Sequence, residues 1–186
     1  MSRLQTVLAA IDTANAADPR MDEGQPECLL YGQRMSEELD RLYPAADDLL
    51  QIAARGQHIE RWTRPRADYP EGRTGYLTWR RDLGAFHADR VGELMADAGY
   101  EAEAIQTAKA MLRKEGIKRN PDVQKLENVI CFVFVKWYFA PFAAKYSGEK
   151  ILRIVEKTAR KMSADARERM LAEFDLPDDL AAAFRV

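Results

Sequence analysis

The sequence predicts an all-α protein folded as a single compact helical domain over residues 1–186. Apolar residues recur at spacings of three and four in nearly every segment, whereas the alternating pattern of a strand is rare. A chain of 186 residues with 47% hydrophobic content is also long enough to bury one substantial core.

The first three helices follow from this spacing and from the prolines that end them. The first begins near Leu4 and ends before Pro19. The second is expected over 29–42, because the residue that precedes Pro44 disfavours the helical backbone. The third is expected over 46–62, where Leu49, Ile52, Ala53, Gly56 and Ile59 share one face.

A long loop is expected at 63–75, which holds two prolines and two glycines among charged residues. Connections in compact domains usually span about 4–6 residues, and longer ones are often functional. We therefore interpret this loop as a possible lid over a site. A fourth helix is expected over 76–95, and Gly116 ends a fifth helix over 101–114.

The sixth helix is expected over 122–145, with Pro121 at its first position. Its run 129–144 is apolar on most sides, but Lys136 divides it, and a membrane span needs about 20 predominantly apolar residues. We interpret it as the central helix of a soluble core and expect no membrane contact. The shorter helices that follow, within a C-terminal extension over 148–186, are expected at 149–161, 164–174 and 178–184.

The composition excludes several classes of protein. The formal net charge is -2 and the sequence pI is about 5.8, so no global positive field attracts nucleic acid, and any anion site must be local. The N-terminus lacks the pattern of a signal peptide. Cys28 and Cys131 lie far apart and have no metal-finger spacing, which favours a reducing compartment and a cytoplasmic protein.

His58 is the first candidate for chemistry. Helical spacing places it beside Arg55, Arg61 and Trp62 at the edge of the core. Arginine binds phosphate, sulfate or carboxylate bidentately, and tryptophan stacks on planar rings, so this face suits a nucleotide-like ligand. The simpler interpretation of this helix alone is a solvated, partly basic end.

His87 is the other histidine of the chain. It shares a helical stripe with apolar residues, and Arg80 lies seven positions before it on the same side. A lone histidine on an apolar face is usually a hydrogen-bonded core residue. Because the two histidines flank the loop at 63–75, the hypothesis that they converge stays open.

Glu127 is the third candidate, since it begins the apolar stretch of the sixth helix. A carboxylate among apolar residues must be paired, coordinate a cation or have a raised pKa. Basic segments at 73–81 and 111–119 offer further anion contacts, or are simply solvated faces. The chain has no GxGxxG, GxxxxGK[ST], HExxH or GxSxG motif, which makes a dinucleotide-binding fold, a P-loop protein, a zincin or a serine hydrolase a poor interpretation.

Several segments together resemble a family known as domain of unknown function 4202, and the resemblance covers most of the chain. The segments are IDTANAADP near the start, YGQRM (31–35), AARGQHIERW (53–62), RRDLGAFHADRVGELM (80–95) and DVQKLENVICFVFVKWYFA (122–140). The family carries no assigned activity, so this resemblance implies a fold and no reaction.

The helix order is also remotely similar to the HD-domain metal-dependent phosphohydrolases. That likeness implies an HD-like fold and places His58 at the histidine of the His-Asp doublet. Ile59 then occupies the aspartate position, Tyr31 the early histidine, and Glu127 with Asn128 the late aspartate. The usual metal ligands are therefore missing; a divalent metal would need His58, His87 and Glu127 to meet.

These observations predict a pocket for a small phosphate- or sulfate-bearing, nucleotide-like molecule, with hydrolysis suggested by the HD likeness alone. The alternatives are a non-catalytic sensor that lost its metal site and a module that binds a partner protein. His58, His87 and Glu127 are the candidate acid/base residues. The expected ligand-binding residues are Tyr31, Gln33, Arg55, Arg61, Trp62, Arg80 and Lys114.

Overall fold

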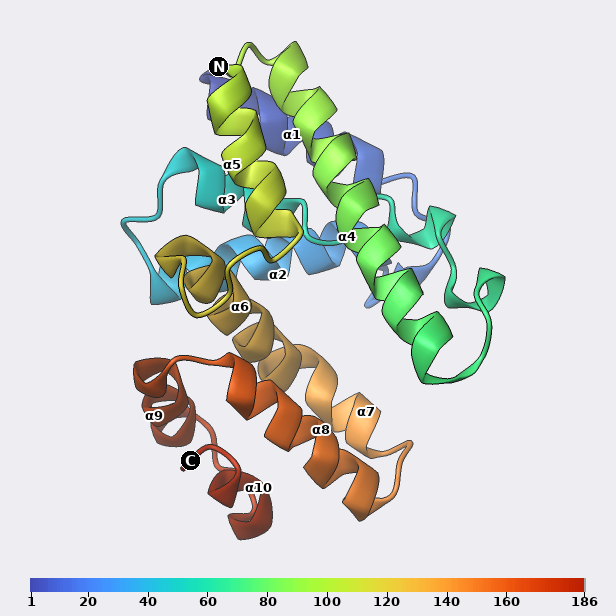
Figure 1. Ribbon diagram of the computed structural model, residues 1–186, viewed down its shortest axis with the longest axis vertical. Helices are drawn as coiled ribbons and strands as arrows, with labels where there is room; N and C mark the ends of the chain where they lie inside the picture. The colour runs from blue at the N-terminus through green and yellow to red at the C-terminus, as the bar shows by residue number, and fades with distance from the viewer. Residues whose placement is uncertain (186) are drawn as a thin grey trace. The chain divides into compact units, whose positions relative to one another are not determined.

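The computed structural model describes residues 1–185 and confirms the all-α prediction (Figure 1). One small antiparallel hairpin, Met21–Asp22 paired with Gln25–Pro26, was not expected from the sequence. The helices are α1 (Arg3–Asn15), α2 (Glu27–Leu42), α3 (Asp48–Arg55), α4 (Gly72–Asp97), α5 (Ala102–Leu112), α6 (Pro121–Val133), α7 (Phe139–Ala143), α8 (Gly148–Lys161), α9 (Ala164–Glu173) and α10 (Asp178–Ala182).

The chain forms two compact units, Met1–Glu115 and Gly116–Val186, so the boundary precedes residue 148, where the sequence predicts a C-terminal extension. In the first unit α4 packs along α5, and α3 contacts α1, α2 and α5 (Figure 1). Its core is made of fully buried apolar side chains. They include Val7, Ile11, Met35, Ile52, Ile59, Val91 and Met95.

The predicted third helix over 46–62 is wrong at its C-terminal end, because α3 stops at Arg55. A Cβ at Gly56 would lie 2.5 Å from Val91 Cγ2, so glycine allows the chain to pass close to α4. Glu60 then adopts a left-handed backbone with φ 47° and ψ 30°, and its N–H donates to Asn15 Oδ1 at 2.9 Å. These constraints turn the chain into a short 3-10 helix, Arg61–Thr63.

The predicted loop at 63–75 ends earlier in the structure, because α4 begins at Gly72 rather than at residue 76. The Arg66 guanidinium holds the loop by donating to the carbonyls of Tyr69 and Pro70, both at 2.8 Å. A Cβ at Gly75 would lie 1.9 Å from Pro70 O, so only glycine lets the loop lie on α4. The start of α4 is therefore fixed by its own loop.

The predicted helix over 122–145 is divided in the second unit into α6, a π-helix at Phe134–Tyr138, and α7. Pro141 explains the division. It has no N–H, and in a regular α-helix its ring would clash with the carbonyl of Trp137 four residues earlier, so a π-helical turn precedes it. Within this unit α8 packs against α6 and α10.

The continuous helical run Pro121–Ala143 is long and apolar enough to cross a membrane by length and composition. In its most apolar window, with mean hydropathy 1.3, 39% is buried within the structure. Core helices of soluble proteins show the same features, so this run is weak evidence for a membrane.

Candidate functional site

Three rings lie together in the first unit. Tyr31, buried on α2, stacks on His58 with ring centroids 3.7 Å apart and planes 13° from parallel. The His58 ring lies 6.3 Å from the ring of His87, which is buried on α4. The structure therefore brings the two histidines of the chain together across the loop that separates them.

Arg61 lies against these rings from the 3-10 helix that follows α3. Its Nη1 atom is 3.4 Å from His58 Nε2, and its guanidinium lies over the ring of Trp79, 4.8 Å from the centroid. Arginine only donates, so at this contact His58 Nε2 accepts and the neutral imidazole carries its proton on Nδ1. The Arg61 side chain is thus held in place by two rings and is partly buried.

Arg80 and Lys114 complete a group that we call the imidazole-arginine cluster: Tyr31, His58, Arg61, Arg80, His87 and Lys114. The pKa of His58 is well below its usual value because of burial, and the positive charge of Arg61 lowers it further. Burial lowers the pKa of His87 to about 3, and Arg61, Arg80 and Lys114 act in the same direction. Both imidazoles are therefore neutral at pH 7.

The two arginines of the cluster differ from several other arginines of this unit, because they have no ion pair with a carboxylate in the described part of the chain. Elsewhere in this unit several buried or partly buried arginines are paired with carboxylates, among them Arg55 with Asp12, Arg34 with Asp22, and Arg90 with Glu60. Over residues 1–185, no carboxylate forms an ion pair with Arg61 or Arg80. Burial lowers the pKa of Arg61, and Arg80 lowers it further, as expected for neighbouring cations.

His87 adds a polar atom without a partner. Its side chain is 4% exposed, and its Nε2 atom has no hydrogen-bond partner in the described part of the chain. A buried polar atom left in this way costs about 1–3 kcal/mol. A hydrogen bond from His87 Nε2 to an oxygen of a bound ligand would remove that cost. The guanidinium groups of Arg61 and Arg80 also bind oxygen atoms, so a ligand that carries several oxygens would suit all three side chains.

Other predicted ligand-binding residues take different positions. The Arg55 guanidinium donates from Nε and Nη2 to Asp12, at 2.7 and 2.6 Å, so its binding capacity is used within the fold. Gln33 is partly buried on α2, and its side chain forms no hydrogen bond in the region described. Trp62 is partly buried, but Trp79 is the tryptophan that packs on Arg61.

Trp79 is the functional residue that the sequence interpretation missed. A signal was present, because Trp79, Leu83 and His87 follow one another at intervals of four along α4. Trp79 is 8% exposed, and its indole N–H donates to the carbonyl of Arg64 at 2.9 Å. It therefore connects the loop, α4 and Arg61.

Glu127 lies in the second unit, on α6, and is 1% exposed. Lys161 Nζ lies 3.4 Å from its Oε1 atom, so the carboxylate is paired, which is one of the three alternatives that the sequence leaves open. Within residues 1–185, no group of three or more His, Cys, Asp or Glu side chains is arranged to hold a metal ion.

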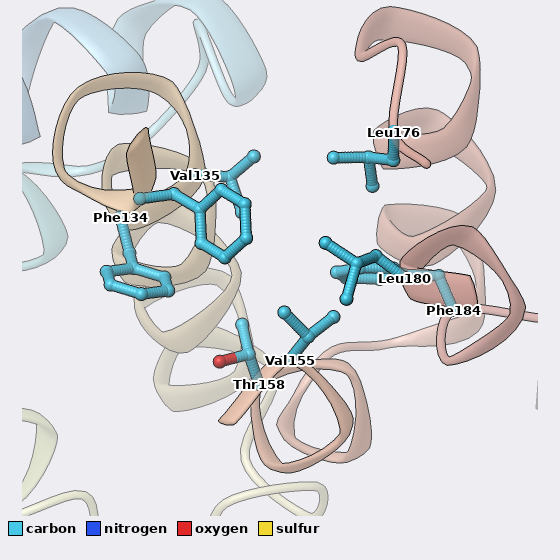
Figure 2. A pocket seen from close by; sticks show the side chains of 8 residues that line it. Phe134, Val135, Val155, Thr158, Leu176, Leu180 and Phe184 are labelled. Carbon is cyan, nitrogen blue, oxygen red and sulfur yellow. The ribbon is translucent and has the colours of Figure 1, made fainter. Parts of the chain in front are cut away.

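Two hollows lie outside the imidazole-arginine cluster, one in each unit. A groove of about 390 Å³ lies along α4 between Arg64 and Glu93, but its carboxylates are paired, for example Asp89 with Lys109 and Glu93 with Arg90. The second hollow, of about 10 Å³, lies in the second unit, where Leu176, Leu180 and Phe184 face Phe134, Val135 and Val155 (Figure 2). It is apolar and has room for about one water molecule, so it is a packing gap.

The chain belongs to a family described as domain of unknown function (DUF4202), whose model matches residues 5–183. This agrees with the family resemblance in the sequence. No curated protein and no solved structure matches the chain.

Proposed function

We propose that the first unit binds a small phosphate- or sulfate-bearing anion at the imidazole-arginine cluster. The observation that carries the proposal is Arg61, a partly buried guanidinium held between His58 and Trp79 with no carboxylate paired to it. A tetrahedral anion presents several oxygens to such donors. Arg80, whose side chain is exposed, would complete the contact at the rim.

The two imidazoles suit a binding role. Because His58 and His87 are neutral, each offers a donor without adding repulsion between cations. The unpartnered Nε2 atom of His87 can donate to the anion or accept from its acidic hydroxyl, depending on its tautomer. Burial strengthens such contacts, because the local dielectric constant is lower than that of water.

The alternative is hydrolysis of a bound ester with His58 as general acid or base. It rests on the remote similarity to the HD-domain phosphohydrolases. An imidazole whose pKa is far below 7 is a weak base and is rarely protonated, so it is poorly matched to proton transfer at neutral pH. We therefore propose binding without turnover. The wild-type chain would be a hydrolase if it released inorganic phosphate from phosphomonoesters faster than the reaction without protein and if His58→Gln abolished this release.

Thermal unfolding of the full chain with phosphate or sulfate tests the proposal. An anion at about one hundred times its dissociation constant adds about 2.7 kcal/mol, which raises the midpoint by roughly 5–10 °C at this size. Arg61→Met and Arg80→Gln should remove most of that shift. Arg81→Gln is the matched control, because Arg81 is the next residue of α4 and pairs with Asp82.

The outcome separates the possibilities. A shift that survives in Arg81→Gln and disappears in both cluster variants supports the proposal. No shift with either anion in the wild-type chain, or an equal loss in all three variants, would overturn it.

A further inference from the structure

An exposed apolar surface adjoins the imidazole-arginine cluster at the start of α4. Tyr76 is 44% exposed and Leu77 is 53% exposed, and both belong to the few large apolar side chains that face solvent in the described chain. Tyr76 lies one helical turn before Arg80, so the two side chains share a face of α4. An anion held by Arg80 would therefore lie beside the Tyr76 ring.

The Tyr76 ring is also connected to the cluster through Trp79. The Tyr76 and Trp79 rings have centroids 5.9 Å apart and planes 49° apart, and Trp79 carries the Arg61 guanidinium on its face. Planar groups thus follow one another from the exposed surface to His58. A ligand with an aromatic ring next to its phosphate would continue this series.

Contacts with the preceding loop fix the start of α4, so the exposed ring of Tyr76 is preorganised for binding. The close contact of Gly75 with Pro70, and the hydrogen bonds from Arg66 to the loop carbonyls, hold the first turns of the helix. Trp79 is anchored by its indole N–H to Arg64 O. A surface fixed before binding loses little conformational entropy when a ring stacks on it.

We propose that the ligand is a phosphomonoester that carries an aromatic ring, as an aryl phosphate or a nucleoside monophosphate does, with Tyr76 as the platform for the ring. This inference rests on the proposed anion site and adds the class of ligand. Arg73, one turn before Tyr76 on an exposed part of the helix, gives the platform a positive edge that suits a ligand of negative charge.

The test compares phenyl phosphate with methyl phosphate, which carry the same anionic group. Isothermal titration of the full chain should give a dissociation constant about tenfold lower for phenyl phosphate, since stacking a ring on an aromatic side chain contributes about that factor or more. Tyr76→Ser should bring the ratio of the two constants toward one. Tyr146→Ser is the control, because Tyr146 is 41% exposed but lies in the other unit, and it should keep the ratio.

The failures are distinguishable. If methyl phosphate and phenyl phosphate bind equally in the wild-type chain, the aromatic platform is refuted while the anion site stands. If neither binds, the proposed function itself fails. If Tyr76→Ser keeps the ratio of the two dissociation constants, the inference is also overturned. It is overturned as well if the wild-type chain self-associates and Tyr76→Ser makes it monomeric, because the exposed face would then be a protein interface.

Discussion

Acid should destabilise the protein through His87, and the effect follows from its burial. The folded state holds this imidazole neutral, with a pKa of about 3 against the usual 6.5. A histidine whose folded pKa is depressed contributes stability that is fully present above the unfolded pKa. That contribution is lost as the pH falls from 6.5 toward 3, because the unfolded chain binds the proton first.

The magnitude follows from the shift. Each pKa unit corresponds to 1.36 kcal/mol, so the shift from 6.5 to about 3 amounts to about 5 kcal/mol over the whole range. At pH 5 the unfolded histidine is almost fully protonated while the folded one is not. The free energy of unfolding should therefore be about 2 kcal/mol lower at pH 5 than at pH 7.5 because of His87 alone.

Urea unfolding followed by circular dichroism at the two pH values measures this loss. His87→Leu, which fills a similar volume without a titratable group, should lose about 2 kcal/mol less than the wild-type chain between pH 7.5 and pH 5. Comparing pH differences cancels any constant effect of the substitution on packing. Equal losses in both chains would show that the imidazole of His87 titrates near its ordinary pKa and is not held neutral by burial.

Three further substitutions have outcomes set by single contacts. Asn15→Ala should lower the unfolding free energy by about 1 kcal/mol in urea, because the left-handed Glu60 loses the acceptor of its N–H. Asn128→Ala should cost about 2–3 kcal/mol in the same assay, since it removes a hydrogen bond donated to Ser163 Oγ and hydrogen bonds accepted from the Ser163 N–H and the Gln124 amide. Arg55→Met should lower the thermal midpoint by breaking the pair with Asp12, yet keep the shift produced by phosphate.

The fold class and most helices follow from local spacing, while the errors lie where distant residues act. The intervals of apolar residues place α1, α2 and α5 close to their observed ranges. The end of α3 depends on Val91 approaching Gly56 and on Asn15 binding Glu60, contacts that span 35 and 45 residues. No local pattern reports such contacts.

The candidate site was predictable to a similar extent. The seven-residue interval from Arg80 to His87 placed both on one side of α4, and both belong to the cluster. The pairing of Arg55 with Asp12 was not predictable, because it joins α3 to α1 across 43 residues. The sequence interpretation grouped Trp62 with Arg61 because it assumed a helix through Trp62, whereas α3 ends at Arg55 and the ring of Trp79 packs on Arg61.

Anion binding and protonation should be linked at this site. The groups that face His58 are Tyr31 from α2, Arg61 from the 3-10 helix, Arg80 and His87 from α4, and Lys114 after α5. Three of these are cations that hold the pKa of His58 low, in addition to its burial. A bound phosphate offsets their charge and favours the imidazolium, so it raises the pKa of both histidines.

The sign of the linkage follows from this change. If the complex binds protons more tightly than the free protein, protonation must also strengthen anion binding by the same factor. Affinity for sulfate, which does not itself titrate in this range, should therefore rise as the pH falls from 7 to 5. Calorimetry in two buffers of different ionisation enthalpy should show uptake of a fraction of a proton per sulfate, and this uptake should shrink in His58→Gln. Uptake of no protons, with an affinity independent of pH, would mean that the anion binds away from the imidazoles and is held by arginine alone.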